Sequence, residues 1–245
     1  MKILILAGGF AKRMGEIAEK TPKALLEIGG KPVIEHILEK IATLDNVDEV
    51  FVSTNKKFEE SFREWIGASN QGLNIDLVVE PVLDEGKKLG SIGALQYFIE
   101  KKHIDEDLFI INGDNIFRFD LSKLIKFYNE KRTFVFGVYN TRNINEAKKM
   151  GVVLSDQNGV VMDFEEKPEN PKSTTVSTGI YMFPKALLPL IKQYLDEGNS
   201  PDRMGDLLIW LMKKQALHAF VFNEQWYDIG TEETYRLADK EFSNG

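Results

Sequence analysis

Two glycines and two cations near the start of the chain could bind phosphate groups. Gly8 and Gly9 follow a short apolar run, and Arg13 and Lys23 lie ten residues apart in the segment that comes next. Glycine lets a backbone approach a ligand closely, because it has no Cβ and tolerates positive φ. Backbone N–H groups, a guanidinium and an ammonium can together surround a triphosphate. The pattern therefore predicts nucleotide binding and chemistry at phosphorus.

The glycine spacing does not fit two common phosphate-binding motifs. Gly8 and Gly9 are adjacent and the next glycine is Gly15, so the segment is not G-x-G-x-x-G. No Gly-Lys-Ser/Thr follows, so it is not a P-loop either. A hydride-transfer dehydrogenase and a Walker-type ATPase are thereby disfavoured. A strand followed by glycine also begins many α/β domains for packing reasons alone, so nucleotide binding needs support from other residues.

Two aspartates that end short apolar stretches, Asp114 and Asp228, could bind a metal ion. Two carboxylates at strand ends can hold one Mg²⁺, a hard cation that prefers oxygen ligands and substrate phosphates. Such an ion would neutralise a leaving pyrophosphate. Asp114 could instead be a turn former, and Asp228 could cap the helix that follows it.

Glu80 precedes Pro81 at the end of a predicted strand. A carboxylate beside a base accepts hydrogen bonds, so it favours donor edges such as guanine N1/N2 or the cytosine amine. The alternative is an exposed strand end without a ligand.

Glu166 and Lys167 precede Pro168, which predicts an extended backbone at Lys167. A carboxylate next to an ammonium suits a sugar phosphate, because the acid accepts from hydroxyl groups and the ammonium binds the phosphate. The alternative is a solvated turn.

The composition narrows the classes of protein. The chain has 245 residues, 43% of them hydrophobic, which is enough for a full core. Its net charge of −7 is unsuited to non-specific nucleic-acid binding, so no nucleic-acid partner is expected. Because there is no cysteine, disulfides, thiolate catalysis and cysteine-based zinc sites are excluded. The histidines, which are far apart in sequence and argue against a His-rich metal site, are His36, His103 and His218.

The first apolar segment is about five residues long and runs into the glycine turn, which is too short for a signal peptide or a membrane span. We therefore expect a cytoplasmic protein that does not bind membranes. Homo-oligomerisation stays open.

Strands and helices alternate in the first part of the chain. Strands are predicted at 3–7, 49–53, 73–79, 108–111 and 133–139, with helices from Pro32 and at 57–65, 91–101 and 121–129. Ser91 is the expected N-cap of its helix. This alternation predicts a three-layer α/β/α sandwich around a mostly parallel, Rossmann-like sheet.

The second part of the chain is richer in strands. An Asn158-Gly159 turn predicts a hairpin between strands at 151–155 and 160–165. Further strands are expected at 176–183 and 217–222, with helices at 185–194, 205–214 and after Thr231. We predict a single domain over 1–245, with a nucleotide half up to about residue 139 and a small β-rich acceptor lobe beyond it. Ligands on parallel sheets bind beyond the carboxyl ends of the strands, where Gly8, Glu80 and Asp114 are expected.

Together the motifs resemble the N-terminal and central signatures of the sugar-1-phosphate nucleotidyltransferases, the NDP-sugar pyrophosphorylases, and Asn112 to Phe117 resembles the glucose-1-phosphate thymidylyltransferase branch. The resemblance covers essentially the whole chain. The segments that carry it are Leu6 to Gly9, Arg13, Pro22 to Leu26, Gly30 to Pro32, Leu89 to Leu95, Asn112 to Phe117, Gly151 to Val153, Glu165 to Pro168, Thr178 to Tyr181 and Asp228 to Thr231.

The resemblance implies that an NTP and a sugar 1-phosphate react with Mg²⁺ as cofactor, the sugar-phosphate oxygen attacking the α-phosphorus in line. It implies four sets of site residues: phosphate binding and catalysis by Arg13 and Lys23; Mg²⁺ binding by Asp114 and Asp228; nucleotide contacts from Leu6, Ala7, Gly8, Gly9, Glu80 and Gly90; and sugar-phosphate contacts from Gly151, Glu166, Lys167 and Thr178.

The sequence departs from the family pattern at several points. Gly9 to Met14 replaces the usual Gly-x-Gly-Thr-Arg-Leu, and Arg13-Met14-Gly15 is similar to the molybdopterin nucleotidyltransferases. Thr178 stands where many relatives have Asn, and we expect no C-terminal β-helix of the kind that many relatives have within these residues. Glu80 favours guanine or cytosine, whereas Asp114-Asn115-Ile116-Phe117 favours thymine or uracil, so the base stays open.

Three other functions stay open beside this one. A metal-dependent glycosyltransferase also uses an aspartate at a strand end, although Arg13 and Lys23 fit a free triphosphate better. A molybdopterin nucleotidyltransferase does not explain Glu166 to Pro168. A regulatory subunit that binds an NDP-sugar without turnover is expected to have lost one of the cations or metal aspartates.

Overall fold

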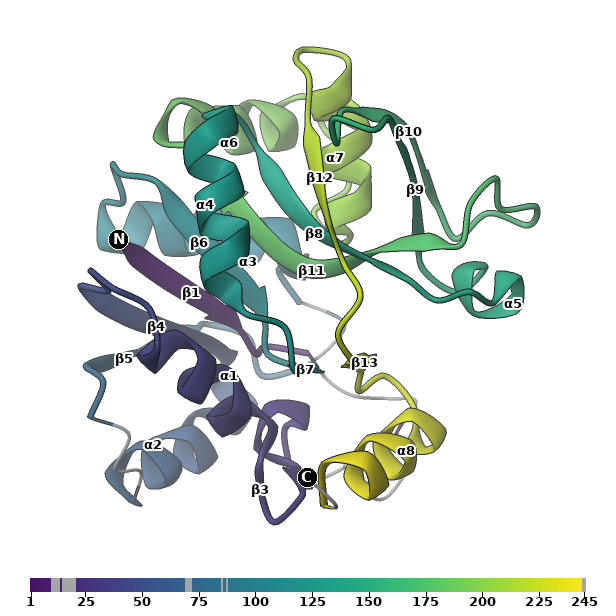
Figure 1. The fold of residues 1–245 in the computed structure, drawn as a ribbon. Helices are drawn as coiled ribbons and strands as arrows, with labels where there is room; N and C mark the ends of the chain where they lie inside the picture. The colour runs from purple at the N-terminus through teal and green to yellow at the C-terminus, as the bar shows by residue number, and fades with distance from the viewer. Residues whose placement is uncertain (10–13, 15–20, 69–71, 85, 87, 244–245) are drawn as a thin grey trace. The chain divides into compact units, whose positions relative to one another are not determined.

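The computed structural model describes residues 1–9, 14, 21–68, 72–84, 86 and 88–243. The chain divides into two compact units (Figure 1). The first unit contains Met1–Leu89, Ile111–Arg118 and Gln225–Gly245, and the second contains Gly90–Ile110 and Phe119–Glu224. This division differs from the boundary expected near residue 139, because the last segment returns to the first unit. The one-domain organisation stays a prediction.

The first unit is built on parallel strands. β1 pairs with β4, and β4 pairs with β5, in parallel. The helices and strands of this unit are β1 (Lys2–Leu6), β2 (Glu27–Ile28), β3 (Lys31–Pro32), α1 (Val33–Ala42), β4 (Glu49–Asn55), α2 (Glu59–Ala68), β5 (Ile75–Glu80), β7 (Asn115–Phe117), β13 (Trp226–Asp228) and α8 (Glu232–Ser243), with short 3-10 turns at Lys23–Leu25 and Lys56–Phe58.

Helix α1 follows the predicted apolar spacing. Its apolar residues recur at the three- and four-residue intervals that put side chains on one face of a helix. They are fully buried: Val33, Ile34, Ile37, Leu38 and Ile41. Pro32 has φ −55° and ψ 143° and stands just before the helix, as its fixed φ and missing N–H favour.

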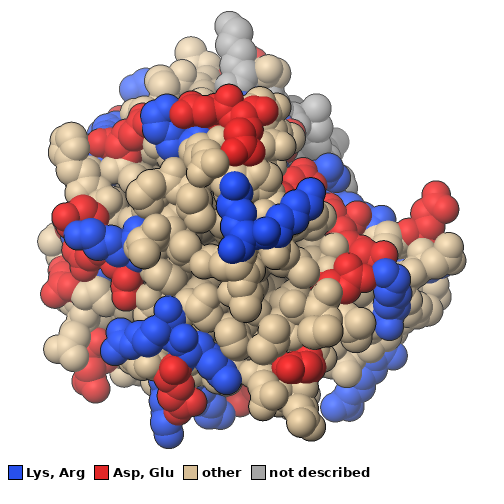
Figure 2. Space-filling view, turned by 90° about the horizontal axis from the view of Figure 1, so that it is seen from above, with Lys and Arg blue, Asp and Glu red and all other residues tan. Residues whose placement is uncertain are grey.

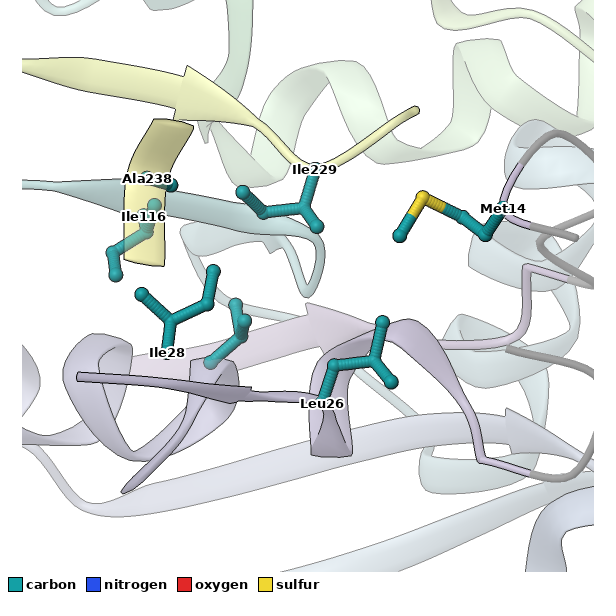
Figure 3. Close-up of a cluster of buried hydrophobic side chains, with 7 residues drawn as sticks. Met14, Leu26, Ile28, Ile116, Ile229 and Ala238 are labelled. Atoms are coloured by element: carbon teal, nitrogen blue, oxygen red, sulfur yellow. The ribbon is translucent and has the colours of Figure 1, made fainter. Parts of the chain in front are cut away.

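A buried cluster connects the start and the end of the chain within the first unit. Met14 lies in it, 1% exposed, with side chains from the β2–β3 hairpin, β7 and α8. Figure 3 shows these apolar side chains converging, and the labelled ones are Met14, Leu26, Ile28, Ile116, Ile229 and Ala238.

Hydrogen bonds also hold α8 to the β2–β3 hairpin. The Gly29 N–H donates to Asp239 Oδ1 at 2.9 Å, and the Tyr235 hydroxyl donates to the Glu27 carbonyl at 2.9 Å. Gly29 has φ +59°, and a Cβ there would lie 2.7 Å from the Phe242 carbonyl oxygen. Glycine is therefore required where the hairpin meets the helix.

The second unit is mainly antiparallel. β10 pairs with β9, and β11 pairs with β8 and β9, all antiparallel, whereas β12 pairs with β8 in parallel. Its helices and strands are α3 (Gly90–Lys102), β6 (Leu108–Asn112, whose last residues belong to the first unit), α4 (Leu121–Lys131), β8 (Val135–Asn140), α5 (Ile144–Ala147), β9 (Gly151–Ser155), β10 (Val161–Glu166), β11 (Thr175–Phe183), α6 (Leu188–Asp196), α7 (Met204–Met212) and β12 (His218–Phe222).

These elements confirm the predicted mixed α/β class and the strand-rich second part, including the hairpin of β9 and β10. The hairpin turn has positive φ at Gly159 alone, and the Asp156 carboxylate accepts from the N–H groups of Asn158 and Val160.

Within the described residues, no helix has the length and apolar character needed to cross a membrane. On the face drawn in Figure 2, basic and acidic side chains lie beside one another.

Candidate functional site

Polar residues at the end of β4 hold the glycine turn that follows β1. The Ala7 N–H donates to the Ser53 carbonyl at 2.8 Å, and Asn55 Nδ2 donates to the Gly8 carbonyl at 2.9 Å. A Cβ at Gly9 would meet no atom of the described residues within 4 Å. The backbone of Gly8 is thus fixed by its neighbour strand, while Gly9 faces open space. Arg13, the predicted catalytic arginine, lies outside the described residues.

Glu80 ends β5 and lies against this turn. The residue is 5% exposed, and the Ser53 hydroxyl donates to its Oε1 at 3.0 Å. A Cβ at Gly8 would lie 2.8 Å from the same oxygen, so a larger residue there would have to displace the carboxylate that Ser53 holds. Burial raises the pKa of Glu80, and the hydrogen bond from Ser53 acts in the opposite direction. The structure therefore brings Gly8 and Glu80 together, as the sequence predicts.

Gly113 brings the Asp114 turn close to the end of β1. Its N–H donates to the Leu6 carbonyl at 2.8 Å. A Cβ at this position would lie 3.1 Å from both the Ala7 Cβ and the Leu6 carbonyl oxygen. These contacts are tighter than is usual for a Cβ, so glycine favours the close approach of the Asp114 turn to β1.

Asp114 forms an ion pair with Lys23. The distance from Lys23 Nζ to Asp114 Oδ2 is 2.9 Å, and the lysine side chain is 14% exposed and the aspartate side chain 30% exposed. The lysine ammonium therefore lies next to a carboxylate that can also face a ligand. This contact joins two residues that sequence reasoning assigned to different roles, phosphate binding and metal binding.

Asp228 comes to the same place through strand pairing. β13 runs antiparallel to β7, with Asp228 opposite Asn115, and the Ile229 N–H donates to the Asp114 carbonyl at 2.8 Å. Trp226 Nε1 also donates to Asn115 Oδ1 at 3.0 Å, which fixes the register. The two aspartates are thus one register position apart, although they are far apart in sequence.

The donor set of this place fits Mg²⁺. Asp228, in β13, and Asp114, directly before β7, carry carboxylate oxygens, the ligands that Mg²⁺ prefers. No group of three or more His, Asp or Glu side chains suited to a metal occurs among the described residues. Two carboxylates are the number expected when substrate phosphates complete the coordination.

In the second unit, Glu166 lies beside two glycines. A Cβ at Gly151 would lie 3.2 Å from Glu166 Oε2, and a Cβ at Gly205 would lie 2.3 Å from the same atom. Burial raises the pKa of Glu166, while Lys167 and Arg203 lower it. The structure therefore brings Gly151 and Glu166 together as predicted, and adds Gly205 and Arg203 from the start of α7.

Lys167 does not have the extended backbone predicted from Pro168. Its φ is +50°, in the left-handed region, and its N–H donates to the Met150 carbonyl at 3.0 Å. The prediction was wrong because this hydrogen bond, next to the last β9–β10 pair, outweighs the local preference of a residue before proline. A non-glycine residue at positive φ is strained, and such residues cluster at ligand sites.

Thr178 and Gly90 have structural roles of their own. Thr178 is 2% exposed and donates its hydroxyl to the Gly137 carbonyl at 2.8 Å, so only the lone pairs of its hydroxyl oxygen remain available to a ligand. Gly90 has φ +75°, and a Cβ there would lie 2.3 Å from the Pro201 carbonyl oxygen. Gly90 belongs to the second unit, apart from the other predicted nucleotide residues.

The predicted N-cap at Ser91 was wrong. Helix α3 already begins at Gly90, and Ser91 Oγ donates to the Asp202 carbonyl at 2.7 Å instead of accepting from the helix. The Ile92 N–H donates to the Pro201 carbonyl at 2.9 Å. The start of the helix is therefore satisfied by backbone carbonyls of a distant loop.

Sequence reasoning missed residues of two kinds. Ser53 and Asn55 are polar residues in a buried strand, and that signal could have found them. Arg203 and Gly205 lie at the start of a helix with no motif around them, so their proximity to Glu166 required the structure.

Comparison with known proteins gives a consistent result. A UTP–glucose-1-phosphate uridylyltransferase from Synechocystis sp. is 30% identical over 96% of this chain and 61% of its own length. The bifunctional protein GlmU of Methanocaldococcus jannaschii is 28% identical over 94% of the chain and 51% of its own length. The chain thus spans about half to two thirds of these curated relatives.

Solved structures have the same fold. A structure assigned as a glucose-1-phosphate thymidylyltransferase from Bacillus anthracis, in complex with sucrose, has a TM-score of 0.85 and 26% identity and covers 100% of this chain and 96% of its own. A UDP-glucose pyrophosphorylase in complex with UDP-glucose has a TM-score of 0.82 at 20% identity, which supports the fold alone. Residues 2–244 match the Nucleotidyl transferase family as a whole, and the chain belongs to that family.

Proposed function

We propose that this protein transfers a nucleotidyl group from an NTP to a sugar 1-phosphate, releasing pyrophosphate and an NDP-sugar. A phosphate oxygen of the sugar 1-phosphate forms a new bond to the α-phosphorus, and the bond from that phosphorus to the pyrophosphate oxygen breaks. Positioning and charge stabilisation suffice for such transfers, so no covalent intermediate with the protein is needed.

The grouping of Lys23 with the two aspartates is the observation that carries the proposal. The ammonium lies 2.9 Å from Asp114, and strand pairing brings Asp228 one register position away. A glycosyltransferase has less use for a lysine here, because its sugar donor is already activated and has no triphosphate. A triphosphate, by contrast, needs both a cation and a metal next to its phosphates.

Asp114 and Asp228 would hold Mg²⁺, which when bound would neutralise charge on the phosphates and the leaving pyrophosphate. Lys23 would move from Asp114 to the phosphates as the nucleotide enters, since ammonium donors bind phosphate oxygens strongly. Arg13 would join it there and stabilise charge at the α-phosphorus. The glycine turn at Gly8 and Gly9 would lie along the nucleotide.

The second unit would bind the acceptor. We assign the sugar hydroxyls to the Glu166 carboxylate, which accepts hydrogen bonds, and the acceptor phosphate to Lys167. Gly151 would contribute room beside Glu166, and Thr178 would contribute a hydroxyl lone pair.

Glu80 would read the base. Its carboxylate is buried and already accepts from Ser53 through Oε1, which leaves Oε2 to accept from an N–H group of the base. This arrangement favours guanine or cytosine over a base that presents mainly carbonyl groups. Glu80→Gln introduces an amide that also donates, so we expect the preference to move toward UTP or dTTP by roughly tenfold in kcat/KM. An unchanged order of preference among the NTPs would remove Glu80 from the base site.

The direct test measures pyrophosphate release with Mg²⁺ while the common NTPs are crossed with a panel of sugar 1-phosphates. We expect release only when both substrates are present, and the active pair identifies the base and the sugar. Failure of every pair, with NDP-sugars still bound in calorimetry, would instead support a binding protein without turnover. Release of nucleoside diphosphate from an NDP-sugar and an acceptor would support a glycosyltransferase.

A further inference from the structure

Gly205 stands at a position where its backbone does not require glycine. It is the second residue of α7 and lies outside the left-handed region. Glycine is among the least favourable residues within a helix, and alanine is the most favourable. A reason other than helix geometry must therefore explain the glycine.

The reason is the room that glycine leaves for the side chains of Glu166 and Phe164. A Cβ on Gly205 would lie 2.3 Å from Glu166 Oε2 and 3.0 Å from Phe164 Cε1. A Cβ on Gly151 would lie 2.5 Å from Phe164 Cζ and 3.2 Å from Glu166 Oε2. The Glu166 carboxylate therefore occupies a notch between two bare α-carbons, which we call the glycine notch of Gly151 and Gly205.

No hydrogen bond joins the Glu166 side chain to any other residue of the described ranges, so contacts and charges alone define its position. The charged groups that face it are Lys167, Arg203 and Asp206. Arg203 is paired with Asp206, with 3.1 Å between Nε and Oδ2. The carboxylate can thus be displaced without breaking a hydrogen bond.

We propose that Gly205 is a positioning residue for the acceptor subsite: the space above its α-carbon sets where the Glu166 carboxylate lies and hence how the sugar 1-phosphate binds. The proposal rests on the proposed function, which assigns Glu166 to the sugar. The atom most in the way, Glu166 Oε2, is the end of a flexible side chain, whereas Phe164 Cε1 needs to move by only a few tenths of an ångström. A methyl group at position 205 therefore displaces mainly the carboxylate and leaves the backbone in place.

Gly205→Ala is the test. We expect KM for the sugar 1-phosphate to rise about tenfold or more, because small misplacements of a binding group are costly, while KM for the NTP stays unchanged. We expect the melting temperature to stay equal or rise, since alanine favours the helix. The matched control is Gly67→Ala in α2, where a Cβ meets nothing within 4 Å, and both KM values should stay unchanged there.

A double-mutant cycle tests whether Gly205→Ala acts on sugar 1-phosphate binding through the Glu166 carboxylate. In a Glu166→Ala background, Gly205→Ala should change KM for the sugar 1-phosphate no further, because the group it displaces is absent. An unchanged KM in the single variant, or an equal additional rise in the Glu166→Ala background, would overturn the proposal.

A second readout does not depend on turnover. The Glu166 carboxyl carbon can be titrated by NMR in protein labelled at glutamate, with Glu166→Gln for assignment. We expect a lower pKa in Gly205→Ala than in the unchanged protein, because the carboxylate moves toward water. If no substrate pair reacts but the pKa values differ, the proposed function is wrong and the effect of Gly205 on the Glu166 carboxylate is confirmed. Equal pKa values in the two proteins would contradict that effect, whatever the activity.

Discussion

Each unit contains a carboxylate that lies against a glycine, buried at Glu80 and half-buried at Glu166, and the two carboxylates are held differently. Glu80 accepts a hydrogen bond from Ser53 at 3.0 Å, with Gly8 beside it. Glu166 has no such bond within the described residues and lies in the glycine notch. A held carboxylate resists displacement and passes strain to the backbone, whereas an unheld one moves. The same substitution, glycine to alanine, should therefore damage stability in the first unit and binding alone in the second.

The first unit also contains the ion pair of Lys23 and Asp114, in which the lysine is bound directly to the predicted metal ligand. Lys23→Ala removes the charge proposed to stabilise the phosphates, so we expect the largest loss of the series, ~10²–10³ in kcat. Initial rates of pyrophosphate release at saturating substrates measure it. Lys126→Ala, which removes an exposed lysine of α4, is the matched control and should keep full activity. A loss below threefold in Lys23→Ala would show that charge at this position does not matter.

Gly8→Ala tests the held carboxylate directly. The new Cβ would lie 2.8 Å from Glu80 Oε1, and the Ser53 hydrogen bond opposes movement of that oxygen. We expect KM for the NTP to rise about tenfold and the melting temperature to fall, with KM for the sugar 1-phosphate unchanged. Thermal unfolding beside steady-state kinetics separates the two effects. An unchanged melting temperature in Gly8→Ala would contradict the inference that Glu80 resists displacement more than Glu166 does.

The two carboxylates should also differ from ordinary glutamates in their pH dependence. Burial raises the pKa of both above the ordinary value of 4.5. The folded state therefore holds their protons more tightly than the unfolded chain, and stability is lost as pH rises from 4.5 through each folded pKa. We expect Glu80→Gln and Glu166→Gln to gain stability relative to the unchanged protein over that window, by about 1 kcal/mol for each unit of pKa difference.

Urea unfolding at a series of pH values between 4 and 8 measures this gain. Glu130→Gln, at an exposed position of α4, is the control and should show no gain with pH. A gain with falling pH in either variant would reverse the sign of the inferred pKa shift.

The sequence predicted those features that depend on the type of a residue and its spacing. The apolar spacing of α1, the alternation of strands and helices, and the charged residues at strand ends each depend on side chains with strong preferences. Asp114 and Glu80 were predicted as charged residues at strand ends, and Lys23 as a cation that follows the glycine turn. Their mutual contacts were not predictable, because the pairing of β7 with β13 joins distant parts of the chain.

The sequence did not predict positions whose role is to leave room for a neighbouring side chain. Gly205 carries no chemical group, and its importance comes from an atom of Glu166 that tertiary packing brings to 2.3 Å from an added Cβ. The left-handed backbone of Lys167 is a similar case, because a tertiary hydrogen bond outweighed the local rule for residues before proline. Local preferences describe what each residue tends to do alone, and these positions are decided by neighbours.

The first unit is assembled from segments that leave the ribosome at very different times. Asp114 emerges before most of the second unit, and its partner strand with Asp228 emerges after all of the second unit. The aspartate pair therefore cannot form on a nascent chain until the whole second unit has been synthesised. We expect nascent chains arrested before residue 225 to protect the second unit, but not the first, from limited proteolysis.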